Sequence, residues 1–166
     1  TLLNGSNVRT TKSWLRNNDI FEVVDHGGFL KTVGVGGSLT GTPADFGLID
    51  DPVKDSVEAK SFTTQQRKWD WYNDVFFTRI HNDTRILLTQ TRWDVNDLSG
   101  KLLDLMEKGT GEQWTVLSLP AIKEDNSFPE DPREIGEALW ERRHSKAKLL
   151  MVKSQSIRTF QSLFQQ

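Results

Sequence analysis

The chain has 166 residues, of which 36% are hydrophobic and 27% charged, and its formal net charge is −2. This size suits one domain with a hydrophobic core, or part of a larger domain. The chain has no cysteine, which excludes a disulfide framework, thiol catalysis and cysteine-based zinc sites, and no apolar run approaches the roughly 20 residues of a membrane helix, so we expect no membrane partner.

The first half of the chain predicts three strands followed by a helix. Strands are expected over 20–25 and 29–37, with a turn at 26–28 between them. A loop over 38–45 leads to a short buried strand over 46–50. A helix is expected within 56–80, because Trp69, Tyr72, Phe76 and Ile80 recur at steps of three and four and form one apolar stripe.

The second half continues this alternation. A strand is expected over 85–91, a helix over 96–109 with Asn96 or Asp97 as its cap and Gly109 at its exit, and another strand over 114–121. Residues 121–139 are polar and rich in proline, which indicates a loop or linker. The end of the chain is amphipathic through Ile157, Phe160, Leu163 and Phe164. Alternating strands and helices predict an α/β fold with a largely parallel sheet.

Charge is distributed unevenly along the chain. Residues 133–166 contain seven Lys or Arg and three Glu, a net charge of +4, whereas the remainder carries −6. A basic segment of this kind fits a phosphate backbone or an acidic neighbour. A solvated helical face is the alternative interpretation.

Polar side chains follow two of the predicted strands. "DFGLIDDPVKD", residues 45–55, ends an apolar run in the carboxylates Asp50 and Asp51, and "TQT", Thr89 to Thr91, ends the next strand. In parallel sheets, ligands bind beyond the carboxyl ends of the strands. If these two strands are neighbours, their ends form one site.

An apolar strand that ends in two acids is the Walker B pattern of P-loop ATPases, in which one acid helps to hold Mg²⁺ and the other orients or deprotonates the attacking water. A solvated turn is the alternative, because Asp favours turns. The phosphate cradle GxxxxGK[ST] is missing: Gly36 and Gly41 have the right separation, but Thr42 stands where Lys is required. Either the chain is no ATPase, or its cradle lies before Thr1.

The ordered series "GVGGSLTG", "GLIDDPVKD", "RILLTQTRWDVNDLSGKLL", "WTVLSLPAI", "GEALWERR" and "FQSLFQQ" resembles the large terminase subunit of tailed bacteriophages, over roughly residues 20–166. That family joins a packaging ATPase with a RecA-like P-loop core to a nuclease, and it drives viral DNA into a capsid. The resemblance implies a RecA-like core that is incomplete at its N-terminus. Residues 1–122 would be the C-terminal portion of the ATPase core, and 123–166 a linker or lid-like subdomain.

The resemblance also implies roles for individual residues, with ATP and Mg²⁺ as cofactors. Asp50 would be the metal-binding acid and Asp51 the catalytic carboxylate, and Thr89, Gln90 and Thr91 would form the coupling motif that senses the γ-phosphate. Arg92 is a candidate for stabilising transferred charge, with a salt bridge to Asp94 or Asp97 as the alternative. The loop 39–43 contains no Arg, which puts activation of a neighbouring subunit from this loop in doubt.

The implied partners are double-stranded viral DNA, a portal protein, a small terminase subunit and further copies of the chain in a homo-oligomeric ring. The implied location is the cytoplasm of an infected or prophage-carrying bacterium. Packaging must tolerate any sequence, so DNA contacts are expected mainly at phosphates. The candidates for these contacts are Arg142, Arg143, Lys146 and Lys148.

Two other functions remain open from the sequence. One is a metal-dependent nuclease that uses Asp50, Asp51, Asp94 and Asp97, since two-metal cleavage needs converging carboxylates. The other is a non-catalytic module that only binds DNA or protein, which fits a chain without a phosphate cradle.

Overall fold

The computed structural model describes residues 19–23 and 25–165, so the first 18 residues of the predicted 1–122 portion, together with Val24 and Gln166, lie outside the described residues. The fold is mixed α/β. An antiparallel pair is formed by β1 (Ile20–Glu22) and β2 (Phe29–Lys31), and a parallel pair by β3 (Phe46–Asp50) and β4 (Arg85–Thr89). The helices are α1 (Ser56–Ala59), α2 (Phe62–Trp71), α3 (Leu98–Glu107), α4 (Lys146–Gln155) and α5 (Ile157–Phe160).

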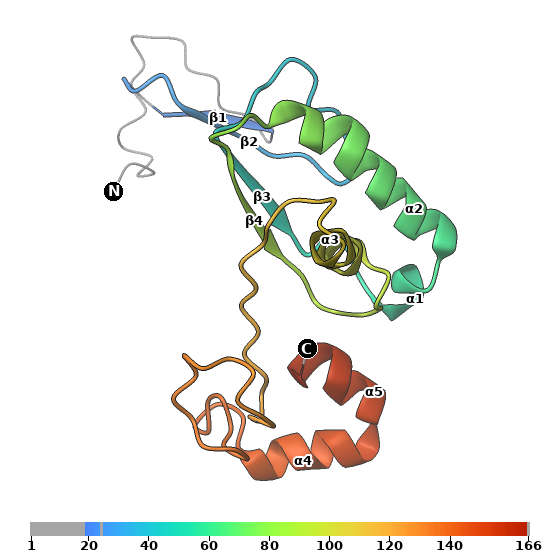
Figure 1. The fold of residues 1–166 in the computed structure, drawn as a ribbon, viewed down its shortest axis with the longest axis vertical. Helices are drawn as coiled ribbons and strands as arrows, with labels where there is room; N and C mark the ends of the chain where they lie inside the picture. The colour runs from blue at the N-terminus through green and yellow to red at the C-terminus, as the bar shows by residue number, and fades with distance from the viewer. Residues whose placement is uncertain (1–18, 24, 166) are drawn as a thin grey trace.

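The chain forms two parts that are joined by one extended segment (Figure 1). We call residues 19–113 the N-terminal unit, which holds both strand pairs and α1 to α3, and residues 120–165 the C-terminal unit, which holds α4 and α5. The connecting segment, residues 114–119, contains no helix or strand. The predicted alternation of strands and helices is confirmed as a mixed α/β fold, but two parallel strands do not by themselves confirm a RecA-like core.

The helix predicted within 56–80 is present, although it is divided. The Asp55 carboxylate accepts hydrogen bonds from the amides of Val57 and Glu58 and so begins α1. Ser61 begins α2 by accepting from the amide of Thr64. Helix α2 then continues into a π-helical turn over Tyr72–Phe76 and a 3₁₀ turn over Phe77–Arg79. The side-chain caps explain why the chain restarts a helix after Lys60.

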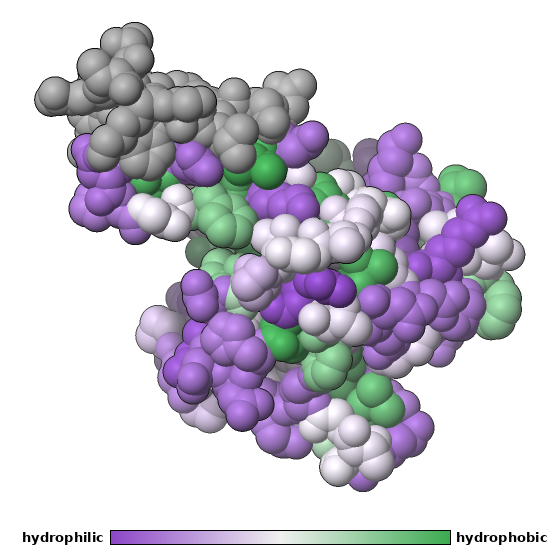
Figure 2. Space-filling view, turned by 90° about the horizontal axis from the view of Figure 1, so that it is seen from above, coloured by the Kyte–Doolittle hydropathy of each residue, from purple (hydrophilic) through white to green (hydrophobic). Residues whose placement is uncertain are grey.

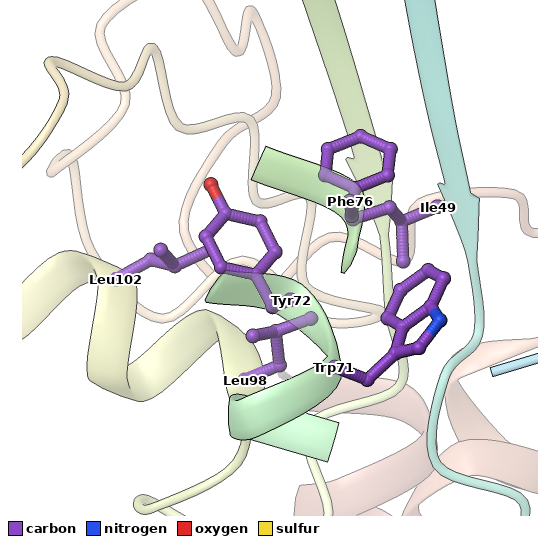
Figure 3. Close-up of a cluster of buried hydrophobic side chains, with 6 residues drawn as sticks. All are labelled: Ile49, Trp71, Tyr72, Phe76, Leu98 and Leu102. Carbon is purple, nitrogen blue, oxygen red and sulfur yellow. The ribbon is translucent and has the colours of Figure 1, made fainter. Parts of the chain in front are cut away.

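The core of the N-terminal unit lies between the parallel strands and two helices that cover the same face of them (Figure 3). Its buried members are Ile49, Trp71, Tyr72, Phe76, Leu98 and Leu102. The predicted stripe is confirmed, since Trp69 and Ile80 pack against this cluster beside Tyr72 and Phe76. Gly47 allows the close approach, because a Cβ atom there would lie 2.5 Å from Cζ of Phe76.

The opposite face of the parallel pair is open. Phe46, Leu48 and Leu87 point to this side and are 59%, 57% and 48% exposed. On the face seen in Figure 2, hydrophilic residues predominate, with separate hydrophobic residues between them. Parallel strands are usually covered on both faces, so this pair has the character of a sheet that lacks one layer.

The prediction of a strand over 114–121 is wrong for the described structure. The segment is extended, but it pairs with no strand in the residues that the structure describes. Val116, Leu117 and Leu119 are 49%, 68% and 42% exposed. A strand exists only through pairing with a neighbouring strand, and the described residues place no strand beside this segment. The strands predicted over 20–25 and 29–37 are present but shorter, as β1 and β2.

The C-terminal unit has a small core made of Ile122, Leu149 and Phe160. The predicted loop 121–139 forms no helix or strand except an isolated bridge between Ile122 and Ala138. The predicted amphipathic end is only partly correct: Phe160 is buried, whereas Ile157 is 62% exposed. Ser156 ends α4 and begins α5, which changes the direction of the apolar face. No helix in the described ranges is long and apolar enough to cross a bilayer.

Candidate functional site

The carboxyl ends of β3 and β4 lie side by side. The two strands run parallel, and their register places Asp50 opposite Thr89. The predicted adjacency of the acid pair and the "TQT" segment is therefore confirmed. Parallel pairing of two apolar strands brings both polar ends to the same edge of the sheet.

Hydrogen bonds connect each acid to the neighbouring strand end. The Thr89 hydroxyl donates to Oδ1 of Asp50 at 2.6 Å, and the Thr91 amide donates to Oδ1 of Asp51 at 3.1 Å. The Asp51 amide donates in turn to the Thr89 carbonyl at 2.8 Å. These bonds fix both carboxylates relative to β4, since each acid has a partner on that strand or just after it.

Asp51 has an unusual backbone conformation. Its φ is 42°, in the left-handed region that is uncommon for residues other than glycine but is tolerated by Asp and Asn. The chain then passes through Pro52 to Val53, which is completely buried. The amide bond to Thr89, the carboxylate bond to Thr91 and the anchored Val53 together hold this conformation. Backbone strain of this kind concentrates at functional sites.

Asp50 and Asp51 are the residues at the strand ends whose side chains could hold Mg²⁺ beside the phosphates of a substrate. Asp50 and Asp51 are both exposed. A cation that binds there would offset the repulsion between their negative charges. Within the described residues no group of three or more His, Cys, Asp or Glu could hold a metal. Mg²⁺ does not need such a group, because it commonly takes one or two carboxylates and completes its shell with water and substrate phosphates.

A cleft of about 750 Å³ begins at the end of β4 and extends toward the C-terminal unit. Thr89, Gln90 and Arg92 line it on one side, the extended segment 114–119 on another, and Trp140, Arg143 and Phe164 on the far side. Its lining is mostly apolar and contains no Asp or Glu. The acid pair does not line the cleft. The expectation that the two strand ends face one shared pocket is therefore not met by this cleft: Asp50 and Asp51 are exposed outside it, whereas Gln90 lines it.

Arg92 forms an ion pair with Asp97, the alternative that the sequence left open. Nε of Arg92 lies 3.1 Å from Oδ2 of Asp97, whose side chain is completely buried. Asp97 also begins α3, because its other oxygen accepts from the amide of Gly100 at 2.9 Å. Asp97 is therefore fully used inside the fold, which argues against the nuclease hypothesis, since that hypothesis needs its carboxylate at a metal.

The four predicted phosphate contacts lie in the C-terminal unit, away from the strand ends. Arg142 and Arg143 precede α4, and Lys146 and Lys148 lie in its first turn; all four are exposed. None of them has an ion-pair partner in the part of the chain that the structure describes. The Arg143 guanidinium lies 5.5 Å from the centre of the exposed Trp140 ring.

Ser99 is a site residue that the sequence analysis missed. Its hydroxyl donates to Oε1 of Gln90 at 3.1 Å across the start of α3. A serine in the first turn of a helix gives no such signal by itself, because serine is common near helix starts for reasons of capping. Only the folding of α3 back onto the end of β4 reveals the contact.

Comparison of the chain with protein-family models, with curated protein sequences and with solved structures found no match. The functional interpretation therefore depends on the sequence pattern and on the geometry of the strand ends.

Proposed function

We propose that this chain is part of the ATP-hydrolysing motor of a viral terminase large subunit, which moves double-stranded DNA into a capsid. The observation that carries the proposal is the pairing of the strand ends: Thr89 donates to Asp50, and the Thr91 amide donates to Asp51. An acid pair held in this way by a polar neighbouring strand end is what a Walker B strand and a coupling motif need. The order of the sequence segments supports the same family.

In this proposal the two acids have different tasks. Asp50 would hold Mg²⁺, which supplies charge neutralisation for the transferred phosphoryl group when ATP is bound. Asp51 would orient the attacking water and accept its proton, and the bond from the Thr91 amide keeps its carboxylate in place for this. Thr89, Gln90 and Thr91 would sense the γ-phosphate. Arg92 stays a candidate for charge stabilisation through its position in the cleft.

The proposal requires a phosphate cradle from a segment outside this sequence. The free edge of β4 supports this, because β4 has no second strand partner among the described residues and faces the cleft at Leu87 and Leu88. A P-loop follows a strand and opens a helix. A strand that paired in parallel with this edge would bring its P-loop to the same end of the sheet as Asp50 and Gln90.

The C-terminal unit would act as the lid-like part and contribute DNA contacts. The exposed cations Arg142, Arg143, Lys146 and Lys148 have no ion-pair partner among the described residues, which suits contacts with phosphates of any sequence. A portal protein, a small terminase subunit and further copies of the chain in a ring are the proposed protein partners, and the cytoplasm of an infected or prophage-carrying bacterium is the proposed location.

The proposal is tested in a longer protein that joins this chain to its upstream cradle segment. We expect Asp51→Asn to lower the rate of phosphate release by about 100-fold or more, because a general base is removed, while binding of a fluorescent ATP analogue with Mg²⁺ changes little. Asn tolerates the left-handed backbone at this position, so the substitution removes the charge without straining the fold.

Asp45→Asn is the matched control, because Asp45 lies exposed at the opposite end of the same strand. This variant is expected to keep full turnover. We also expect the 166-residue chain alone to release no phosphate from ATP. Steady release by the chain alone, or equal loss of binding and turnover in the Asp51 variant, would contradict the proposal.

A further inference from the structure

In the side-chain amide of Gln90, one polar atom has a hydrogen-bond partner and the other has none in the described structure. Its Oε1 accepts the hydrogen bond from the Ser99 hydroxyl at 3.1 Å. Its Nε2 is buried and has no hydrogen-bond partner in the described structure. A buried N–H group without a partner is unfavourable and rare. Gln90 lines the cleft at the end of β4, so its amide lies at the wall of the space that a ligand would enter.

The position of Ser99 relative to Gln90 is fixed by the start of α3. Asp97 caps this helix and pairs with Arg92, so the helix start is tied to the residue that follows the coupling motif. Gly100 allows the start of α3 to pack against the loop that precedes it, because a Cβ atom there would lie 1.9 Å from the carbonyl oxygen of Val95. The backbone that carries Ser99 is therefore tied to the segment that follows Gln90.

We propose that Ser99 is a positioning residue that sets the orientation of the Gln90 amide. By occupying Oε1, the hydroxyl leaves Nε2 to donate to an incoming anionic or water oxygen. The inference rests on the proposed function for the identity of that acceptor, which is an oxygen of the γ-phosphate or of the attacking water. In a flipped amide, Nε2 would donate to the Ser99 oxygen and Oε1 would face the incoming oxygen. These two acceptor oxygens would repel each other.

The orientation is tested in the ¹⁵N-labelled chain through the side-chain NH₂ signals of Gln90, which are assigned by their loss in Gln90→Glu. We expect Ser99→Ala to move these signals toward those of the exposed Gln113 and to increase their exchange with water several-fold. Ser99→Thr, which keeps the hydroxyl, restores them. Thr115→Val removes another hydroxyl that lines the cleft and leaves them unchanged. The backbone spectrum reports whether each variant is folded.

Gln90 signals that are the same in the wild type and in folded Ser99→Ala would overturn the inference, whatever the chain does with ATP. If Ser99→Ala does not fold, a Ser99→Thr variant with Gln90 signals moved away from those of the wild type has the same consequence. A second experiment uses the longer protein with the cradle. There we expect Ser99→Ala to lower kcat by about tenfold, less than removal of a direct donor, with an unchanged KM for ATP and recovery in Ser99→Thr. Absence of any ATPase activity would count against the proposed function, while the NMR result would still decide the role of Ser99.

Discussion

The N-terminal and C-terminal units are stabilised in different ways. The N-terminal unit buries six large apolar side chains between one face of a sheet and two helices. The core cluster of the C-terminal unit has three. Both units also bury polar residues, among them Asp97 in the N-terminal unit and Lys123 and Asp131 in the C-terminal unit. The Lys123 ammonium donates to the carbonyls of Asp131 and Arg133 at 3.0 and 2.6 Å. Arg133 in turn binds the Asp131 carboxylate through two of its nitrogens.

The two units differ in how their buried backbone groups obtain hydrogen-bond partners. Regular elements satisfy most of their own backbone groups, so the buried charges of the N-terminal unit, Lys68 and Asp97, pair with the side chains of Glu58 and Arg92. The loop 121–139 has almost no regular structure, and its buried carbonyls need other donors. Lys123 and Arg133 supply them. In the C-terminal unit, charged side chains therefore provide the hydrogen bonds to buried carbonyls that helices and sheets provide in the N-terminal unit.

The largest effect is expected from removing an aromatic ring in the N-terminal unit. Phe76→Ala should lower the free energy of unfolding by about 3–5 kcal/mol, because a buried ring that contacts Trp71 and Tyr72 leaves a cavity. Urea unfolding measures the loss, and hydrogen exchange by mass spectrometry should locate it in residues 19–113. Phe77→Ala is the neighbouring control, since Phe77 is 42% exposed. Equal losses of unfolding free energy in both variants would contradict a dominant role for the buried aromatic cluster in the N-terminal unit.

A smaller effect is expected from Lys123→Met, which keeps the length of the side chain and removes the ammonium. The carbonyls of Asp131 and Arg133 then lose a donor, and we expect a loss of about 2–3 kcal/mol. The increase in hydrogen exchange should be confined to residues 120–165. Lys148→Met, at an exposed position of α4, is expected to stay within about 0.5 kcal/mol of the wild type. A Lys123→Met protein as stable as wild type would show that apolar packing is sufficient in both units.

The smallest effect is a dependence on acid pH. The side-chain hydrogen bond from Arg133 lowers the pKa of Asp131 below its ordinary value of 3.8, and the one from Lys68 lowers the pKa of Glu58 below 4.5. A lowered folded-state pKa means that each stabilising contribution is complete above the ordinary value and is lost as the pH falls through the lowered one. The stability advantage of wild type over Asp131→Asn or Glu58→Gln should therefore shrink as the pH falls below 3.8 or 4.5. An advantage that does not change between pH 6 and 3 would contradict this.

The N-terminal unit was more predictable from the sequence than the C-terminal unit. The steps of three and four from Trp69 to Ile80 identify the buried face of α2 and the turn after it, and Asp97 and Gly109 mark the ends of α3 correctly. The neighbouring strand ends were also predicted, because parallel pairing places them at one edge. In each case the pattern arises from local periodicity or from a general property of parallel sheets.

The features that were not predicted depend on contacts between segments distant in the sequence. The bond between Ser99 and Gln90 exists only because α3 folds back onto β4. The role of Lys123 depends on carbonyls eight and ten residues later in an irregular loop, for which no periodicity exists. The strand expected over 114–121 failed for the opposite reason: its apolar pattern is clear, but the described chain provides no partner strand.

The segment 114–119 has a mechanical consequence. At about 3.3–3.6 Å per extended residue, six residues span at most roughly 20 Å. An extended segment of this kind resists a pull better than a push, because it is paired with no strand in the residues that the structure describes. Displacement of α3 away from the C-terminal unit would therefore pull on that unit through this segment. Displacement toward it would bend the segment instead. The connection therefore transmits force between the two units better in tension than in compression.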